Sequence, residues 1–191
     1  MPSSKKTTKK PTQPKVAESE PDDKTKNPRI KYGDMVTVKV RCRFTKPFMG
    51  GLATRDEQDD PMNALYRDGD RFVIPARGLR AMLRDGSPFI DMSGTETTHV
   101  YTTDGTIDMN GSSVERLREI PILGRTGGRG FINSEIITTG AEFETSFAVP
   151  TKAISLTKFK ELLTACGKWV GVGAYRKGDF GTFELLEFKP E

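Results

Sequence analysis

Residues 168–185 constrain the fold most, because they carry the chain from a helix pattern into a strand pattern through four glycines. Glycine lacks a Cβ and tolerates positive φ, so such a junction lets either a second backbone or a ligand come close. It is no Walker loop, since no Gly-Lys-Ser/Thr follows its glycines, and no dinucleotide fingerprint, since its helix precedes them. We expect either a tight helix-to-strand crossover or a binding loop, and no nucleotide or other cofactor.

A helix and a strand are predicted on the two sides of this glycine-rich junction (residues 168–185). Before it, Ser155 or Thr157 can cap a helix. The apolar side chains of that helix recur at helical spacing and form a stripe suited to the core: Leu156, Phe159, Leu162, Leu163 and Cys166. Residues 182–188 are predicted to form the final strand, and we expect Trp169 and Phe180 to be core residues.

The cleanest strand pattern lies much earlier, over residues 35–45, where apolar and polar side chains alternate. One face is apolar: Val36, Val38, Val40, Cys42 and Phe44. The other carries Lys39, Arg41 and Arg43. This cationic face is either an ordinary solvated sheet surface or a surface lined with cations for a phosphate backbone.

A second cationic element is predicted as a helix. A short apolar strand over residues 71–74 leads into Pro75, which suits a first helical turn, and Gly86 ends the helical pattern. Spacings of three and four would place Arg77, Arg80 and Arg84 along one face of this helix. That face is either a solvated polar surface or an anion-binding stripe.

The middle of the chain gives weaker patterns. The turn signal Thr103-Asp104-Gly105 predicts a hairpin of residues 97–103 and 105–109, and residues 113–118 are predicted to form a short helix. Arg125 and Arg129 stand on a glycine-rich loop that can meet an anionic backbone or serve as a mobile turn.

Two further strands are predicted over residues 131–138 and 141–149, joined as a hairpin at Thr139-Gly140. Phe143, Thr145, Phe147 and Val149 share one face of the second strand. The scattered aspartates show no spacing that implies paired acid and base work. We therefore expect no catalysis.

Residues 1–29 contain almost no large apolar side chains, so we expect a disordered tail. This tail holds eight basic and four acidic residues, which accounts for the whole formal net charge of +4. Thirty basic residues less these eight leave 22, and 26 acidic residues less these four also leave 22. The pI of about 9.0 therefore does not indicate a cationic domain, and any cationic surface must come from the placement of charges.

Cys42 and Cys166 are the only cysteines, and we expect both to be small buried apolar residues of a protein in a reducing compartment. Two cysteines and a single His99 predict neither a disulfide nor a metal site. No apolar run is long enough to span a bilayer, and the first residues lack the apolar core of a signal peptide. We expect a cytoplasmic protein without membrane contact.

The order strand, helix, hairpin strands, helix, strand predicts an α+β fold, a ferredoxin-like or RRM-like antiparallel sheet with two helices on one face. It would fill residues 30–191 as one domain, with loop insertions around 52–70 and 88–130.

Three segments point to a family. Residues 44–51 form a strand that ends in a Gly-Gly turn, residues 72–84 a strand, a proline and a basic helix, and residues 171–181 a glycine-rich loop before the last strand. Together they resemble the RAMP superfamily, the RRM-like proteins that include the backbone subunits of CRISPR effector complexes. The chain also resembles small phage proteins with the same C-terminal pattern, which would place it in the host cytoplasm.

The resemblance implies binding of single-stranded nucleic acid, more often RNA than DNA, by a protein that can assemble side by side as a homo-oligomer or within a multi-subunit complex. Arg77, Arg80 and Arg84 would hold phosphates, and Arg176 and Lys177 would supply charge. The glycines that would let the strand approach are Gly171, Gly173, Gly178 and Gly181. Further candidate binding residues are Lys39, Arg41, Arg43, Arg125, Arg129 and, for base stacking, Tyr175.

Two other functions fit the same sequence. The first is a viral structural or assembly protein that self-associates without nucleic acid, through sheet edges and glycine-rich loops. The second is an enzyme that acts on nucleic acid, such as a phosphodiesterase, for which the sequence offers no recognisable metal cluster, nucleophile or acid pair.

Overall fold

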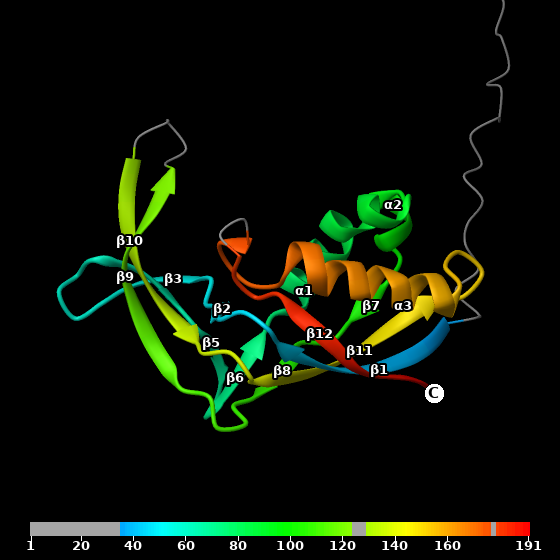
Figure 1. Cartoon of the computed structure of the whole chain (residues 1–191), viewed down its shortest axis with the longest axis horizontal. Coiled ribbons are helices and arrows are strands. Elements are labelled where there is room, and N and C mark those ends of the chain that lie inside the picture. Colours follow the sequence, from blue (N-terminus) through cyan, green and yellow to red (C-terminus); the bar gives the residue numbers. More distant parts are fainter. Residues whose placement is uncertain (1–34, 124–128, 177–178) are drawn as a thin grey trace, which may run out of the picture. The chain divides into compact units, whose positions relative to one another are not determined.

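A computed structural model of the chain describes residues 35–123, 129–176 and 179–191, with residues 119–123 and 129 described by their backbone alone (Figure 1). All of them belong to one unit, Tyr32–Glu191. The tail predicted over residues 1–29 lies outside the described residues.

Strand β1 (Met35–Phe44) is built as its alternation predicts. Val38, Val40, Cys42 and Phe44 are buried, and the residues between them are exposed. β1 lies between β11 (Glu142–Pro150) and β12 (Phe183–Pro190) and runs antiparallel to both. The predicted burial of Cys42 and Cys166 is also confirmed.

Seven strands of the described residues form the antiparallel sheet that contains β1. Their order is β12-β1-β11-β8-β6-β5, and β7 also pairs with β11. The additional strands are β5 (Tyr66–Asp68), β6 (Arg71–Ile74), β7 (Tyr101–Thr102) and β8 (Gly105–Asp108).

The ferredoxin-like core consists of four of these strands and two helices. Helix α1 (Ala76–Gly86) precedes β8, and helix α3 (Leu156–Ala165) precedes β12. In chain order β1, β8, β11 and β12 are the first to fourth core strands, and they lie in the order fourth, first, third, second. The predicted α+β fold class is confirmed.

Helices α1 and α3 both cover one face of this sheet (Figure 1). Leu79, Met82 and Leu83 of α1 are buried, as are the Phe159, Leu162 and Leu163 side chains of α3. The ring of Phe159 stands edge-on to Phe147 of β11, with centroids 5.3 Å apart. The side chain of Ser155 caps α3 by accepting a hydrogen bond from the Lys158 N–H at 3.2 Å.

Three short turns of helix extend these two helices. A 3₁₀ turn, η1 (Ser87–Ile90), and the short helix α2 (Gly94–Thr97) follow α1. A π-helical turn, η2 (Cys166–Val170), follows α3 and leads into the glycine-rich junction. None of the helices in the described part of the chain has the length and apolar character needed to cross a lipid bilayer.

A second sheet combines strands from both predicted insertions with β2 and β10, which lie wholly or mostly outside those insertions. Its order is β2-β10-β4-β3, with β9 paired to β10. The strands are β2 (Phe48–Met49), β3 (Leu52–Arg55), β4 (Pro61–Ala64), β9 (Val114–Leu123) and β10 (Arg129–Ile137). β10 runs parallel to β4 and antiparallel to β9 and β2.

The prediction of a short helix over residues 113–118 is wrong. This segment belongs to β9, which pairs with β10 from Val114↔Ile137 to Leu123↔Arg129. Its glutamate, arginine and leucine residues favour a helix locally. Pairing with β10 provides backbone hydrogen bonds along one edge of the segment, and this long-range contact overrides the weak local preference.

Both predicted hairpins are also wrong in their pairing. β7 and β8 do not pair with each other; Thr102 of β7 lies opposite Phe147, and Ile107 of β8 lies opposite Phe143, so both line up along β11. Thr139-Gly140 does join two strands, but β10 and β11 belong to different sheets. A turn signal shows that the chain reverses, and it does not show which edge the next strand joins.

Candidate nucleic-acid interface

Helix α1 presents three arginines on its exposed side, as predicted. Because Leu79, Met82 and Leu83 are buried, Arg77, Arg80 and Arg84 are exposed. The side chain of Arg80 forms no ion pair with any residue that the structure describes, and Arg84 pairs with its neighbour Asp85 at 2.9 Å. We call Arg77, Arg80 and Arg84 the arginine face.

Arg77, the remaining member of the arginine face, has an aromatic neighbour. Its guanidinium lies 5.3 Å from the centroid of the Tyr66 ring and donates a hydrogen bond to the Tyr66 hydroxyl. A guanidinium over an aromatic face is stabilised by the ring quadrupole. Arg77 is therefore held in place beside β5 and still keeps free N–H donors.

The glycine-rich junction packs closely against other parts of the chain. Gly171, Gly173 and Gly181 all have positive φ, at +71°, +95° and +70°. The Val172 N–H donates to Gly181 O at 2.9 Å, Gly181 N–H to Pro47 O at 2.8 Å, and Ala174 N–H to Met49 O at 3.1 Å. The crossover interpretation is confirmed, and approach of a nucleic-acid strand to these glycines stays a prediction.

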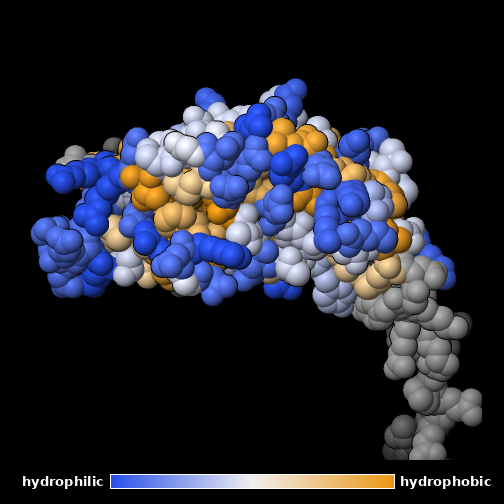
Figure 2. Space-filling view, turned by 90° about the horizontal axis from the view of Figure 1, so that it is seen from below, coloured by the Kyte–Doolittle hydropathy of each residue, from blue (hydrophilic) through white to orange (hydrophobic). Residues whose placement is uncertain are grey.

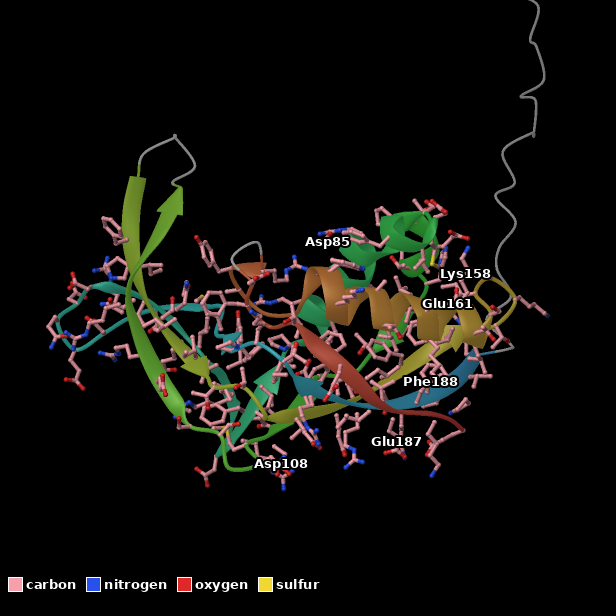
Figure 3. All side chains as sticks on the ribbon, viewed as in Figure 1. Asp85, Asp108, Lys158, Glu161, Glu187 and Phe188 are labelled. Atoms are coloured by element: carbon pink, nitrogen blue, oxygen red, sulfur yellow. The ribbon has the colours of Figure 1, made fainter. Side chains whose placement is uncertain are left out.

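Both ends of α1 contact the junction. At the N-terminal end, Gly173 and Ala174 line a cavity together with Pro75, Arg77 and Gly78. Near the C-terminal end, Arg176 Nη2 lies 2.8 Å from Asp85 Oδ2, on the helix side of the sheet (Figure 3). The structure therefore brings Gly173 and Arg176 together with the arginine face.

Tyr175 lies between these two contacts. Its φ is +51° and its side chain is 42% exposed. Its ring centroid is 6.0 Å from that of Phe180. The ring is thus accessible beside Arg176, as a stacking role would require.

The ion pair of Asp85 with two arginines affects its protonation. Partial burial raises the pKa of Asp85, but hydrogen bonds from Arg84 and Arg176 outweigh it and hold the pKa below its ordinary value. The pair therefore stabilises the fold at neutral pH, above the unfolded-state pKa of about 3.9, and this contribution is lost as the pH falls through the folded-state pKa.

We expect Asp85→Asn to lower the free energy of unfolding at pH 7 by about 1 kcal/mol or less, because the pair is partly exposed. The difference from the wild type should shrink below about pH 4 as the wild-type carboxylate takes up a proton. Thermal unfolding, followed by circular dichroism from pH 7 down to pH 2, measures this difference in stability. Asp70→Asn, at an exposed aspartate, is the control, and a difference that stays constant down to pH 2 would contradict the assignment.

The cations of β1 lie on the opposite face of the sheet and are paired with carboxylates. Lys39 Nζ is 2.8 Å from Glu191 Oε1. Arg41 lies 3.7 Å from both Glu142 and Glu187, and Arg43 lies 2.7 Å from Glu142 and 3.5 Å from Glu184. Lys39, Arg41 and Arg43 are thus neutralised by β11, β12 and the residue after β12.

Two views show how this open face, the one turned away from α1 and α3, is arranged. Glu187 lies on it, on the other side of the sheet from Asp85 (Figure 3). Figure 2 shows the molecule from this side, where hydrophilic residues are interspersed with apolar ones. The structure does not bring the β1 cations together with the arginine face, and their phosphate binding stays a prediction.

Four other predicted site residues lie wholly or partly outside the described residues. Arg125, Lys177 and Gly178 lie outside the described residues, and Arg129 is described only as the first residue of the β10 backbone.

Gly51 and Tyr66 line the cavity beside Arg77, and neither was predicted to be a site residue. Both lie in or next to the first insertion, and no sequence spacing relates them to α1. The expectation that Trp169 is a core residue is wrong, because Trp169 is 59% exposed. Its ring stacks on that of Phe89, with the ring centroids 6.4 Å apart. The wider π turn of η2 shifts the register at the end of α3, so the helical stripe does not continue to Trp169.

No group of three or more metal-ligating side chains is present among the described residues. Two carboxylates at α1 have structural partners, since Asp104 Oδ1 accepts a hydrogen bond from the Ala76 N–H at 2.7 Å and Asp85 pairs with Arg84 and Arg176. The exposed charge of this interface therefore comes from arginine.

No family model matches the chain, and no curated protein matches it. Among solved structures, it is similar to a chain in the cryo-EM structure of the type III-B Cmr-beta complex bound to cognate target RNA, with a TM-score of 0.50 and 13% sequence identity. The match covers 82% of this chain and 60% of that one, so this chain spans about three fifths of the other's length. At this identity the likeness concerns the fold alone: the chain has a ferredoxin-like fold.

Proposed function

We propose that the chain binds single-stranded nucleic acid, RNA in preference to DNA, along α1 and the glycine-rich junction, and does not cleave it. The observation that carries this proposal is the arginine face. Three guanidinium groups lie along one exposed side of α1, and Arg80 has no ion-pair partner among the described residues.

The contrast between the two faces of the sheet supports the choice of surface. On the open face, each cation of β1 lies within 4.0 Å of a glutamate. A phosphate would have to displace those carboxylates before it could bind. On α1, Arg77 and Arg80 need no such exchange, and from Arg77 to Arg84 the helix rises about 10 Å, enough to contact more than one phosphate.

The preference for RNA and the absence of cleavage each have their own support. The solved structure with a similar fold is part of a complex bound to target RNA, which favours RNA. Asp85 is held in an ion pair with Arg176, and Asp104 accepts a hydrogen bond from the N–H of Ala76 at the start of α1. A general base or metal ligand there would first have to give up those bonds.

Fluorescence anisotropy with labelled single-stranded RNA, single-stranded DNA and double-stranded RNA of equal length tests this function. If three arginines neutralise three phosphates, the logarithm of the affinity should fall against the logarithm of the salt concentration with a slope of about −2. RNA should bind more tightly than DNA of the same sequence and remain intact after prolonged incubation. Binding that is absent at low salt, or independent of salt, would reject the proposal.

The proposal includes assembly side by side along the strand, which is supported by the neighbour's place in a multi-subunit complex. The mass of the complex, measured by light scattering with RNAs of increasing length, should rise in steps of one chain. A fixed mass on every RNA would reject assembly alone. An oligomer that forms identically after nuclease treatment would instead favour a self-associating structural protein.

A further inference from the structure

A small cavity opens at the N-terminal end of α1, directly beside the arginine face. Its volume is about 230 Å³, below the roughly 300–1,000 Å³ of sites that hold drug-sized ligands. Four parts of the chain meet around it: β2 and the residues after it, strand β5, the β6–α1 boundary and the glycine-rich junction. Its size suits a single planar ring system.

The walls of the cavity are largely apolar. Buried Phe48 and Ile74 form part of its lining, together with Pro75 and Ala174. An apolar lining with few polar groups favours a flat, weakly hydrated group over a phosphate or a sugar. A phosphate-binding site would instead show several converging donors.

The polar groups of the cavity belong to Arg77 and Tyr66. The Arg77 guanidinium already lies over the Tyr66 ring, and the Tyr66 hydroxyl donates to Gly51 O at 3.0 Å, which fixes the tyrosine across one side. Arg77 has five N–H donors, of which Tyr66 takes one. The others can meet the carbonyl and ring-nitrogen acceptors at the edge of a base.

We propose that this cavity takes one unstacked nucleobase of the bound single strand, a site that depends on the nucleic-acid binding proposed above. The base lies against Tyr66 and Ala174 with its edge toward Arg77. Arg80, one helical turn further along α1, then meets the phosphate backbone. Single-stranded recognition commonly pairs an exposed base on an aromatic ring with cations along the backbone.

Gly51 offers a direct way to fill the cavity. It has no positive φ, and a Cβ built there would lie 3.6 Å from the Ala174 Cβ and 3.9 Å from the Tyr66 ring, in ordinary contact. Gly51→Leu therefore places its side chain between two cavity walls without backbone strain. Ala53→Leu, at an exposed position of β3 outside the cavity, adds a leucine nearby and is the matched control.

The test compares three proteins, the wild type, Gly51→Leu and Ala53→Leu, on two RNAs by fluorescence anisotropy. The probes are a short oligouridylate and a counterpart of equal length and charge with an abasic ribose at every position. The wild type and Ala53→Leu should bind the oligouridylate about tenfold or more tightly than the abasic strand. Gly51→Leu should bind the abasic strand as the wild type does, and most of its preference for the base-containing strand should be lost.

The same preference in Gly51→Leu as in the wild type would overturn the nucleobase site, and so would equal weakening of both strands. If the wild type binds neither strand at low salt, the proposed function itself fails. If Gly51→Leu does not fold, as judged by its thermal midpoint, Tyr66→Leu removes the aromatic wall instead. Tyr66→Leu should show the same selective loss of affinity for the base-containing strand. An unchanged preference of Tyr66→Leu for that strand would overturn the nucleobase site.

Discussion

Replacing Arg77, Arg80 and Arg84 together by glutamate should abolish retention of single-stranded RNA at moderate salt. The change removes three cations from one exposed face and puts three anions in their place, so phosphate attraction becomes repulsion. We expect at least about a hundredfold loss of affinity. Anisotropy titration of the triple variant against the wild type measures it.

A second triple variant separates local contact from total charge. Lys152, Lys160 and Lys189 are exposed and lie outside the arginine face, and their replacement by glutamate changes the net charge by the same amount. This control should retain most of the RNA binding. If both triple variants lose binding equally, the attraction comes from the charge of the whole molecule; unchanged binding by a folded arginine-face variant would remove α1 from the interface.

Periodicity in the sequence predicted both strand β1 and the helix that carries the arginine face. The alternation of β1 and the helical spacing of Leu79, Met82 and Leu83 each report which side chains face a common core, and burial in the structure follows both patterns. The four core strands and two helices were therefore predictable. So was the placement of Arg77, Arg80 and Arg84 on one exposed side.

Pairing between distant segments was not predictable in the same way. β9 carries charged residues on an exposed ribbon, so no apolar alternation distinguishes it from a helix, and its strand character comes from β10. The cavity at α1 has the same origin. Gly51, Tyr66 and Gly173 meet there because the junction hydrogen-bonds to Pro47 and Met49, a contact without any local signal.

The pairing of the β1 cations illustrates a further limit. The sequence shows lysine and arginine on one strand face, but their electrostatic effect depends on the strands beside them. In the register of the sheet Arg43 lies opposite Glu142 on one side and Glu184 on the other. Opposite charges on neighbouring strands attract, so a stripe that is cationic in sequence is close to neutral in the folded sheet.

Gly181→Ala should be among the most damaging single substitutions in the chain. Gly181 has a φ of +70°, and a Cβ built there would lie 1.8 Å from Val172 O. Val172 O is a backbone atom, so the clash is relieved only if the backbone of the glycine-rich junction moves. Left-handed strain and this clash together should cost about 3 kcal/mol or more of unfolding free energy. For a domain of this size that corresponds to a fall of roughly 6–12 °C in the thermal midpoint.

Gly69→Ala isolates the backbone-strain part of that effect, so the difference between the two variants gives the steric part. Gly69 also has a positive φ, +58°, but nothing lies within 4 Å of the point where a Cβ would stand, so alanine there meets only the strain. We expect a loss of about 1 kcal/mol and a midpoint about 2–4 °C lower. Equal midpoints for the two variants would show that the junction yields to a methyl group. A much lower midpoint for Gly181→Ala would show that close backbone contact with Val172 holds the junction rigid beside α1, as a surface prearranged for a nucleic-acid strand requires.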